Sequence, residues 1–298
     1  MTDDFTFAHL TDAHLPSHGG FAAGELTGKR ALSALNWALH RRERHDRGVA
    51  DALSADVLRF APDHVAMTGD VVNFGLEREC RAGAEWLAGF GGAERLSYVP
   101  GNHESLHRDC ERHWRAAFAP FAPGGDWPFA RRFGDVAFIG VSTSIPTPPG
   151  YAQGEVGAAQ REAMKALLSE RRGAFRVLLI HHPPTNMTKP SKSLRDRRAV
   201  SAAIAEAGAD LILHGHDHRN EMSWIDRADG CRIPVLGAPS ASTPFGHGEA
   251  AEWRLISVAR EAGDWRISVR RRAIGPDGAF ADVGRFAFRV PVQADFSA

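Results

Sequence analysis

Short apolar runs, each followed at once by polar residues, recur along the first two thirds of the chain. Five of these runs have the length and the β-branched content of buried strands, and they cover residues 5–10, 65–68, 96–99, 175–180 and 209–213. Between them lie segments whose apolar positions follow a helical spacing, at 29–44, 77–90, 158–172 and 198–207. This alternation predicts βαβ units and a mostly parallel sheet.

The pattern changes after Asn220. Strand-like segments at 222–225, 233–236, 253–258 and 265–270 are separated by turn signals, and none has helical spacing. We therefore expect antiparallel strands at 219–290 that complete a second sheet packed on the first. Because no repeat or linker divides the sequence, we expect one domain over 1–298, with its motifs in 5–218. Three segments at strand ends resemble insertions that set specificity: 14–27, 124–128 with 145–154, and 185–197.

Charge and composition narrow the class of protein. Lys plus Arg and Asp plus Glu both total 36 in 298 residues, so no global field favours nucleic acid. The N-terminus is acidic, and no apolar run approaches the ~20 residues that span a bilayer. Three widely spaced cysteines fit a reducing compartment. We expect a cytoplasmic protein without membrane or nucleic-acid partners, which could form a homodimer.

Each of the five predicted strands ends in a cluster of Asp, Asn or His. In chain order the clusters are Asp12-Ala13-His14, Gly69-Asp70, Gly101-Asn102-His103-Glu104, His181-His182 and Gly215-His216-Asp217-His218. Taken singly, most of them are ordinary turn chemistry. Ligands bind beyond the carboxyl ends of parallel strands, so the clusters should converge there. Their mixture of carboxylate, amide and imidazole groups suits transition metal ions.

This ordered set resembles the calcineurin-like metallophosphoesterase superfamily, from about Phe5 to His218. The resemblance implies a four-layer α/β/β/α sandwich of two mixed sheets flanked by helices. It also implies two transition metal ions, of Mn²⁺, Fe²⁺/Fe³⁺ or Zn²⁺. One ion would be held by Asp12, His14, Asp70 and His218, and the other by Asp70, Asn102, His181 and His216. Asp70 would bridge the two, and the proline two residues later favours His181 over His182.

Two such ions would activate a water and neutralise a phosphoryl group, which leaves protonation of the leaving oxygen to a side chain. His103 directly follows Asn102 and can supply a proton near pH 7, so we expect a general acid rather than a purely structural histidine. Glu104 could orient the His103 ring. Candidate substrate contacts are Asn73, Glu104, His182, Lys189, Lys192 and Arg195. For the last three, the alternative is a solvated helix start.

The expected reaction is hydrolysis of a phosphodiester by attack of a metal-bound hydroxide on phosphorus. The resemblance is greatest to the bacterial class III cyclic nucleotide phosphodiesterase and glycerophosphodiesterase group, which makes a cyclic nucleotide a candidate substrate. Alternatives within the fold are a phosphomonoesterase, a nucleotide-sugar or lipid pyrophosphohydrolase, or a nuclease. A non-catalytic scaffold is a further alternative, but a scaffold should have lost a ligand or the proton donor, and every such position is filled here.

Overall fold

The computed structural model describes residues 4–16, 20–22, 24–171, 173–185 and 189–293, and these form two six-stranded sheets. The first sheet has the order β12-β11-β10-β1-β2-β3. Its strands are β1 (Phe5–Leu10), β2 (His64–Met67), β3 (Leu96–Tyr98), β10 (Glu252–Glu261), β11 (Asp264–Ile274) and β12 (Phe280–Pro291). The second has the order β4-β5-β6-β7-β9-β8. Its strands are β4 (Phe129–Phe133), β5 (Val136–Gly140), β6 (Phe175–Leu179), β7 (Leu211–His214), β8 (Glu221–Asp226) and β9 (Arg232–Gly237).

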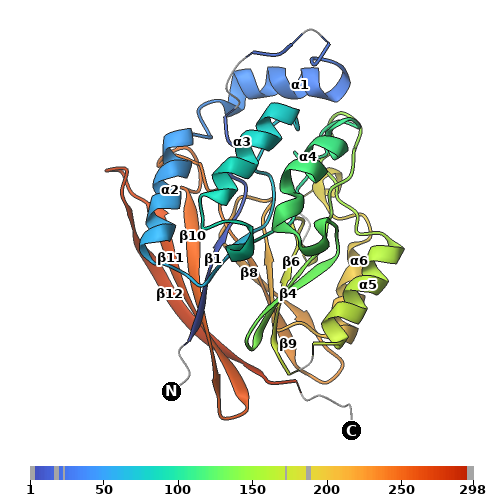
Figure 1. The fold of residues 1–298 in the computed structure, drawn as a ribbon, viewed down its shortest axis with the longest axis vertical. Helices are drawn as coiled ribbons and strands as arrows, with labels where there is room; N and C mark the ends of the chain where they lie inside the picture. Colours follow the sequence, from blue (N-terminus) through green and yellow to red (C-terminus); the bar gives the residue numbers. More distant parts are fainter. Residues whose placement is uncertain (1–3, 17–19, 23, 172, 186–188, 294–298) are drawn as a thin grey trace.

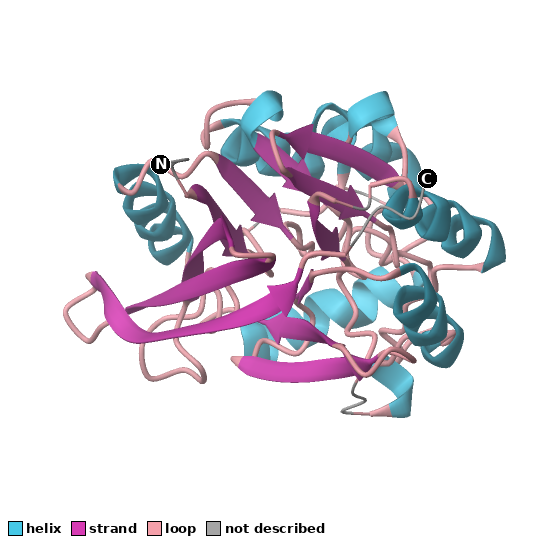
Figure 2. Ribbon diagram, turned by 90° about the horizontal axis from the view of Figure 1, so that it is seen from below, coloured by secondary structure: helices cyan, strands magenta, loops and turns pink. Residues whose placement is uncertain are grey.

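Helices cover the outer faces of both sheets, as Figure 2 shows from below. They are α2 (Arg47–Arg59), α3 (Glu77–Ala88), α4 (Cys110–Phe118), α5 (Ala158–Ser169) and α6 (Arg197–Ala207). Helix α1 (Gly28–Asn36), which continues into the π-helical turn η1 (Trp37–Arg41), lies at one end of the molecule instead (Figure 1). Helix α2 contacts β10 and β12, whereas α5 contacts β5 and α6 contacts β8. The predicted α/β/β/α sandwich is therefore confirmed. No helix in the described part of the chain is long and apolar enough to cross a membrane.

The central strands β5, β6 and β7 of the second sheet are buried along their whole length because both faces are covered. In β5, Phe138 points into the core shared with the first sheet, and its neighbour Ile139 packs with the α5 and α6 side. Leu179 and Leu178 divide in the same way on β6. Phe7 of β1 meets Phe138 edge to face, with ring centroids 5.1 Å apart. This contact joins the two sheets.

Strand direction follows the prediction, but the choice of sheet does not. Strand β1 pairs in parallel with β2, and β2 with β3, while β5, β6, β7 and β9 form a second parallel set. After residue 219, β8 and β9 extend the second sheet, whereas β10 returns to pair antiparallel with β1. The prediction that all strands of 219–290 belong to the second sheet is wrong for β10, β11 and β12. A strand's own pattern fixes its faces and not its distant partner.

Parts of two expected insertions, residues 17–19, 23 and 186–188, lie outside the described residues. The described remainder of 14–27 leads into α1, which lies at the end of the molecule toward which β1 runs (Figure 1). The segment 145–154 is attached to this region, because Lys29 Nζ donates to Thr147 Oγ1 at 2.6 Å and to Tyr151 O at 2.8 Å. The 145–154 segment is therefore fastened to the start of α1, directly after the first expected insertion.

Candidate metal centre

All five motif clusters meet at the carboxyl ends of β1, β2, β3, β6 and β7. The first half of the centre contains His14, whose Nε2 lies 3.2 Å from Nε2 of His218 and 3.9 Å from Oδ2 of Asp70. Asp12 Oδ1 lies 3.1 Å from the same His218 nitrogen. The other oxygen of Asp12 accepts hydrogen bonds from Thr11 Oγ1 at 2.6 Å and from a backbone N–H at 3.0 Å. Its free oxygen therefore faces the histidines, as a shared cation requires.

The second half of the centre is built around His181, which lies on the strand end opposite Asp70. Its Nε2 is 3.3 Å from Asp70 Oδ2 and 3.4 Å from Asn102 Oδ1. Its Nδ1 donates to Thr68 O at 2.7 Å, so Nε2 is the nitrogen free to bind a metal. His216 Nδ1 is 2.8 Å from Asn102 Oδ1, and its buried Nε2 has no hydrogen-bond partner among the described residues. One ligand atom each from Asp70, His181 and His216 lie within 4.8 Å of one another.

The backbone at these positions is strained. Five of the seven predicted ligands have a positive φ, which side chains larger than glycine rarely adopt: Asp12 (53°), His14 (40°), Asp70 (52°), His216 (73°) and His218 (52°). Only Ala61 and Ala262 share this conformation among the other non-glycine residues that the structure describes. Such strain costs on the order of 1–3 kcal/mol per residue and is found mainly at functional sites.

Two glycines of the motifs permit the close approach of the strand ends. A Cβ at Gly101 would collide with the Asp70 carboxylate, and one at Gly215 would collide with Thr11 and Asp12. Glycine at these positions is therefore a packing requirement of the centre itself, in addition to turn chemistry.

Burial and charge prepare the side chains for a cation. Burial lowers the pKa values of His14 and His216 well below the usual range, so both rings are neutral, the form that binds metal. Burial also lowers the pKa of His181, but the Asp70 carboxylate outweighs it and raises that pKa to about 10. Burial raises the pKa of Asp70, yet His181 and His103 bring it well below its ordinary value. A metal ion at Asp70 would thus displace a proton from His181.

Glu104 does not have either of the roles expected from the sequence. It is fully buried, and both of its oxygens are occupied by backbone N–H donors. The donors are Gly101 (2.7 Å) and Asp70 (3.0 Å) on Oε2, and Val71 (2.7 Å) and Val72 (3.3 Å) on Oε1. The predictions that Glu104 orients the His103 ring or contacts substrate are wrong, because this carboxylate satisfies N–H groups that have left the sheets.

Asn73 is likewise a buried structural residue. Its amide nitrogen donates to His14 O at 3.0 Å and to Leu15 O at 2.9 Å, and its backbone oxygen lies 2.7 Å from Nδ1 of His103. Asn73 therefore holds the loop that carries His14 and fixes the His103 ring. Both amide hydrogens are thus used within the protein, whereas Oδ1 is buried without a partner among the described residues, and the substrate contact of Asn73 stays a prediction.

His182 also has both ring nitrogens engaged. Its Nδ1 lies 2.7 Å from Thr143 Oγ1, and its Nε2 lies 3.1 Å from Ala152 O. The buried ring packs on His216 with centroids 4.2 Å apart. His182 thus supports a predicted ligand, and its predicted contact with substrate would require one of these two hydrogen bonds to break.

His103 lies beside the centre, as the sequence predicts. Its backbone N–H donates to Asp70 Oδ1 at 2.8 Å, and its ring Nε2 is 3.0 Å from Nη1 of Arg41. Because a guanidinium can only donate, Nε2 accepts and the ring carries its proton on Nδ1. Burial lowers the pKa of His103 to about 4. Ligand atoms of His14, Asp70 and His103 also lie within 4.8 Å of one another.

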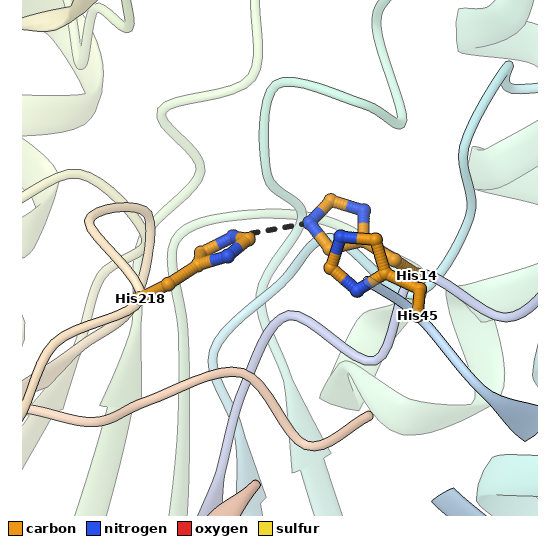
Figure 3. A group of neighbouring side chains, drawn as sticks. All are labelled: His14, His45 and His218. Carbon is orange, nitrogen blue, oxygen red and sulfur yellow. Dashed lines mark hydrogen bonds between the residues drawn. The ribbon is translucent and has the colours of Figure 1, made fainter. Parts of the chain in front are cut away.

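The sequence interpretation missed two residues of the centre, Arg41 and His45. Arg41 ends the π-helical turn η1, and His45 comes just before α2. The His45 ring lies against His14 with centroids 4.4 Å apart, and His218 faces the pair (Figure 3). One ligand atom from each of these three histidines lies within 4.8 Å of the others. The only sequence signal was the basic run Arg41-Arg42-Glu43-Arg44-His45, which has no motif spacing.

The basic segment after β6 is exposed. Arg195 is used in contacts with Gln153 Oε1 at 3.1 Å and Glu155 at 3.6 Å. Lys189 is exposed, and so is Lys192, whose charge helps to lower the pKa of His216 after burial and His181. The charge of Lys192 is therefore felt at the predicted ligand His216.

Residues 5–220 match the family model for calcineurin-like phosphoesterases. The chain belongs to this family. Calcineurin-like phosphoesterases bind two transition metal ions and act on small phosphoesters, and the Asp and His clusters of this chain could hold those ions. It is therefore a metal-dependent phosphoester hydrolase by family. No curated protein sequence matches the chain significantly.

Solved structures agree on the fold. A dimetal phosphatase from Danio rerio is 15% identical, with a TM-score of 0.61 over 97% of this chain and 99% of that one. GAP50, described as the anchor in the inner membrane complex of Plasmodium, is 11% identical, with a TM-score of 0.56 over 99% and 90% of the respective chains. At such identities the likeness establishes a shared architecture.

Proposed function

We propose that this calcineurin-like phosphoesterase hydrolyses a phosphodiester with the aid of two transition metal ions. The proposed ligands are Asp12, His14, Asp70 and His218 for one ion, and Asp70, Asn102, His181 and His216 for the other. The observation that carries the proposal is the left-handed backbone of five of these residues. Backbone strain at several ligands is expected where a metal centre must be preorganised. A scaffold that only binds a partner protein would gain nothing from such strain.

The donor set fits the ions of this family. Imidazole, carboxylate and amide groups together accept Mn²⁺, Fe²⁺ or Zn²⁺. The buried Nε2 of His216 lacks a partner among the described residues, and the Asp70 carboxylate lies between both sets of histidines. When bound, two such ions would supply a nucleophilic hydroxide near neutral pH and neutralise charge on the phosphoryl group.

The chain's own contribution to the reaction is positioning and proton transfer. Thr68 O fixes the His181 ring through Nδ1, and Thr11 fixes Asp12 through Oδ2. We assign His103 to protonating the leaving oxygen. Because Asn73 O holds its Nδ1, Nε2 is the atom that would carry the transferred proton. An anionic substrate beside the ring would raise its pKa from the value of about 4 caused by burial.

The substrate class rests on sequence resemblance to the cyclic nucleotide phosphodiesterase and glycerophosphodiesterase group. A phosphomonoester and a pyrophosphate-linked substrate are the alternatives. A panel of alkyl and cyclic diesters, monoesters and pyrophosphates, assayed at equal concentration, would rank them by kcat/KM.

Asp70→Ala provides the test, because it removes the only ligand shared by both ion positions. We expect about two ions per wild-type chain by elemental mass spectrometry, and close to none in the variant. Asp51→Ala, which changes an exposed carboxylate on α2, should keep both ions. Wild-type hydrolysis of an aryl phosphodiester should be abolished by a chelator and restored by Mn²⁺. A metal-loaded wild-type protein that cleaves no ester on the panel would favour the scaffold instead.

A further inference from the structure

Arg41 is placed above the candidate metal centre without an acidic partner. Its Nη1 lies 3.0 Å from Nε2 of His103, and its Nη2 lies 3.4 Å from Nε2 of both His14 and His45. Within the described part of the chain, no carboxylate forms an ion pair with this guanidinium. Arg41 is half-buried, and charged side chains that lose much of their contact with water are normally paired, so a guanidinium whose contacts are ring nitrogens requires an explanation.

Electrostatics supply that explanation. The negative charges that act on the Arg41 guanidinium are those of Asp70 and Asp12. Both carboxylates belong to the proposed ligand set, so two bound cations would more than neutralise them. The guanidinium would then lie beside a positive centre with no countercharge. Only a bound anion would restore the balance.

We propose that Arg41 binds the phosphoryl group of the substrate and places it over the metal centre. This inference rests on the proposed function. The planar guanidinium can donate to two phosphoryl oxygens at once, which a lysine cannot do. An ion bound to Nε2 of His14 would take away that acceptor, so the N–H group of Nη2 that faces it would already be free for a phosphoryl oxygen. On substrate binding, the N–H group that faces Nε2 of His103 would also turn to a phosphoryl oxygen, and Nε2 of His103 would become accessible to the leaving group.

His45 is the positioning residue for Arg41. Its Nδ1 lies 2.9 Å from Ser242 Oγ, and its Nε2 faces Nη2 of Arg41. Since the guanidinium is the donor in that contact, His45 is neutral with its proton on Nδ1, directed at Ser242.

The backbone that carries Arg41 is also built for this position. The N–H of Arg42 bonds to Trp37 O at 2.9 Å, an i to i+5 contact of the π-helical turn. Such turns are rare in proteins as a whole, but many of those that occur lie at functional sites, where the extra residue redirects the side chains that follow. Lys29, near the start of α1, fastens the other end of the segment to the 145–154 loop.

Arg41→Ala, Arg41→Lys and the control Arg42→Ala test the inference. Arg42 is exposed and adjacent in sequence, so its loss removes the same charge outside the centre. Inorganic phosphate is the probe, titrated by calorimetry into protein incubated with Mn²⁺, and elemental analysis reports the ion content. We expect Arg41→Ala to weaken phosphate binding by roughly 10- to 100-fold, the range for lost hydrogen bonds to a charged group. Ion content should be unchanged, Arg41→Lys should recover part of the affinity, and Arg42→Ala should match wild type.

Two results would overturn the inference: phosphate binding that is as tight in Arg41→Ala as in wild type, or wild-type protein that binds no phosphate. The proposed function is judged separately, by ester hydrolysis. Protein that binds phosphate through Arg41 but cleaves no ester would refute the function and keep the assignment of Arg41. Protein that cleaves esters, but whose phosphate affinity does not change when Arg41 is replaced, would support the function and refute the assignment of Arg41.

Discussion

Glu104→Gln tests whether one buried carboxylate holds the two loops that carry Asp70 and Asn102. Each oxygen of Glu104 accepts two backbone N–H groups, at 2.7 and 3.0 Å on Oε2 and at 2.7 and 3.3 Å on Oε1. Glutamine keeps one acceptor oxygen and turns an NH₂ group toward the other pair of donors. Two buried N–H groups therefore lose their partner in either orientation of the amide.

The magnitude follows from the cost of those orphaned groups. A buried donor left unsatisfied costs about 1–3 kcal/mol, so two of them should lower the free energy of unfolding by about 2–6 kcal/mol. At ~2–4 °C per kcal/mol for a chain of this size class, the expected fall in Tm is on the order of 10 °C. Because the N–H of Asp70 is one of the four donors, metal affinity should weaken as well.

Glu79→Gln is the matched control. Burial raises the pKa of Glu79 and of Glu104 to about 7, so denaturant titrations at pH 8 in the presence of a chelator keep both ionised. Glu79 accepts from Phe74 N at 2.9 Å and from Leu76 N at 3.2 Å, but both bonds go to Oε2. A glutamine there can keep both with its one oxygen, so we expect a loss below ~1 kcal/mol. Equal losses of unfolding free energy in the two variants would refute the argument that donors on both oxygens make Glu104 the more sensitive residue.

Two further predictions concern histidines. His103→Ala should retain both ions yet lower kcat by about 10²–10⁴-fold on an alkyl diester. The loss should be smaller on a nitrophenyl ester, whose leaving group needs no proton. Equal losses on both substrates, or a loss of metal, would show that the role of His103 is structural. His64, far from the centre, has its pKa lowered to about 3, mainly by burial. Below pH 6.5 the unfolded chain binds a proton at His64 that the folded chain does not bind. As the pH falls from 6.5 toward 3, this difference lowers the free energy of unfolding by up to about 1.4 kcal/mol per pH unit, and above pH 6.5 it has no effect. Urea titrations at pH 7 and pH 5 should show a smaller fall in His64→Leu than in wild type.

The sequence predicts the centre well where the signal is local. A strand covered on both faces is a continuous apolar run, and its metal-binding side chains follow within a few residues, so the sequence alone places Asp12, Asp70 and His181 at strand ends. The same logic misassigned Glu104, because adjacency to His103 does not reveal that its side chain turns toward the loop after β2.

Features that depend on long-range return of the chain were not accessible. Arg41 and His45 reach the centre because α1 and η1 fold back over the strand ends, and nothing in their spacing encodes that path. Strand β10 has the alternating pattern of any half-buried strand, and its pairing with β1 is decided by which edge is free. Helix α2 and strand β12 were not predicted at all, because polar residues interrupt their apolar positions.

The two ligand sets each draw on both sheets, and the sheets themselves meet through packed side chains such as Phe7 and Phe138. The packing that sets the distance between the two sheets therefore also sets the distances between the ligands that come from different sheets, although this packing lies away from the ligands. A transfer of this centre to another protein would have to reproduce the packing of one sheet on the other, since loops taken from one sheet alone would leave both ligand sets incomplete.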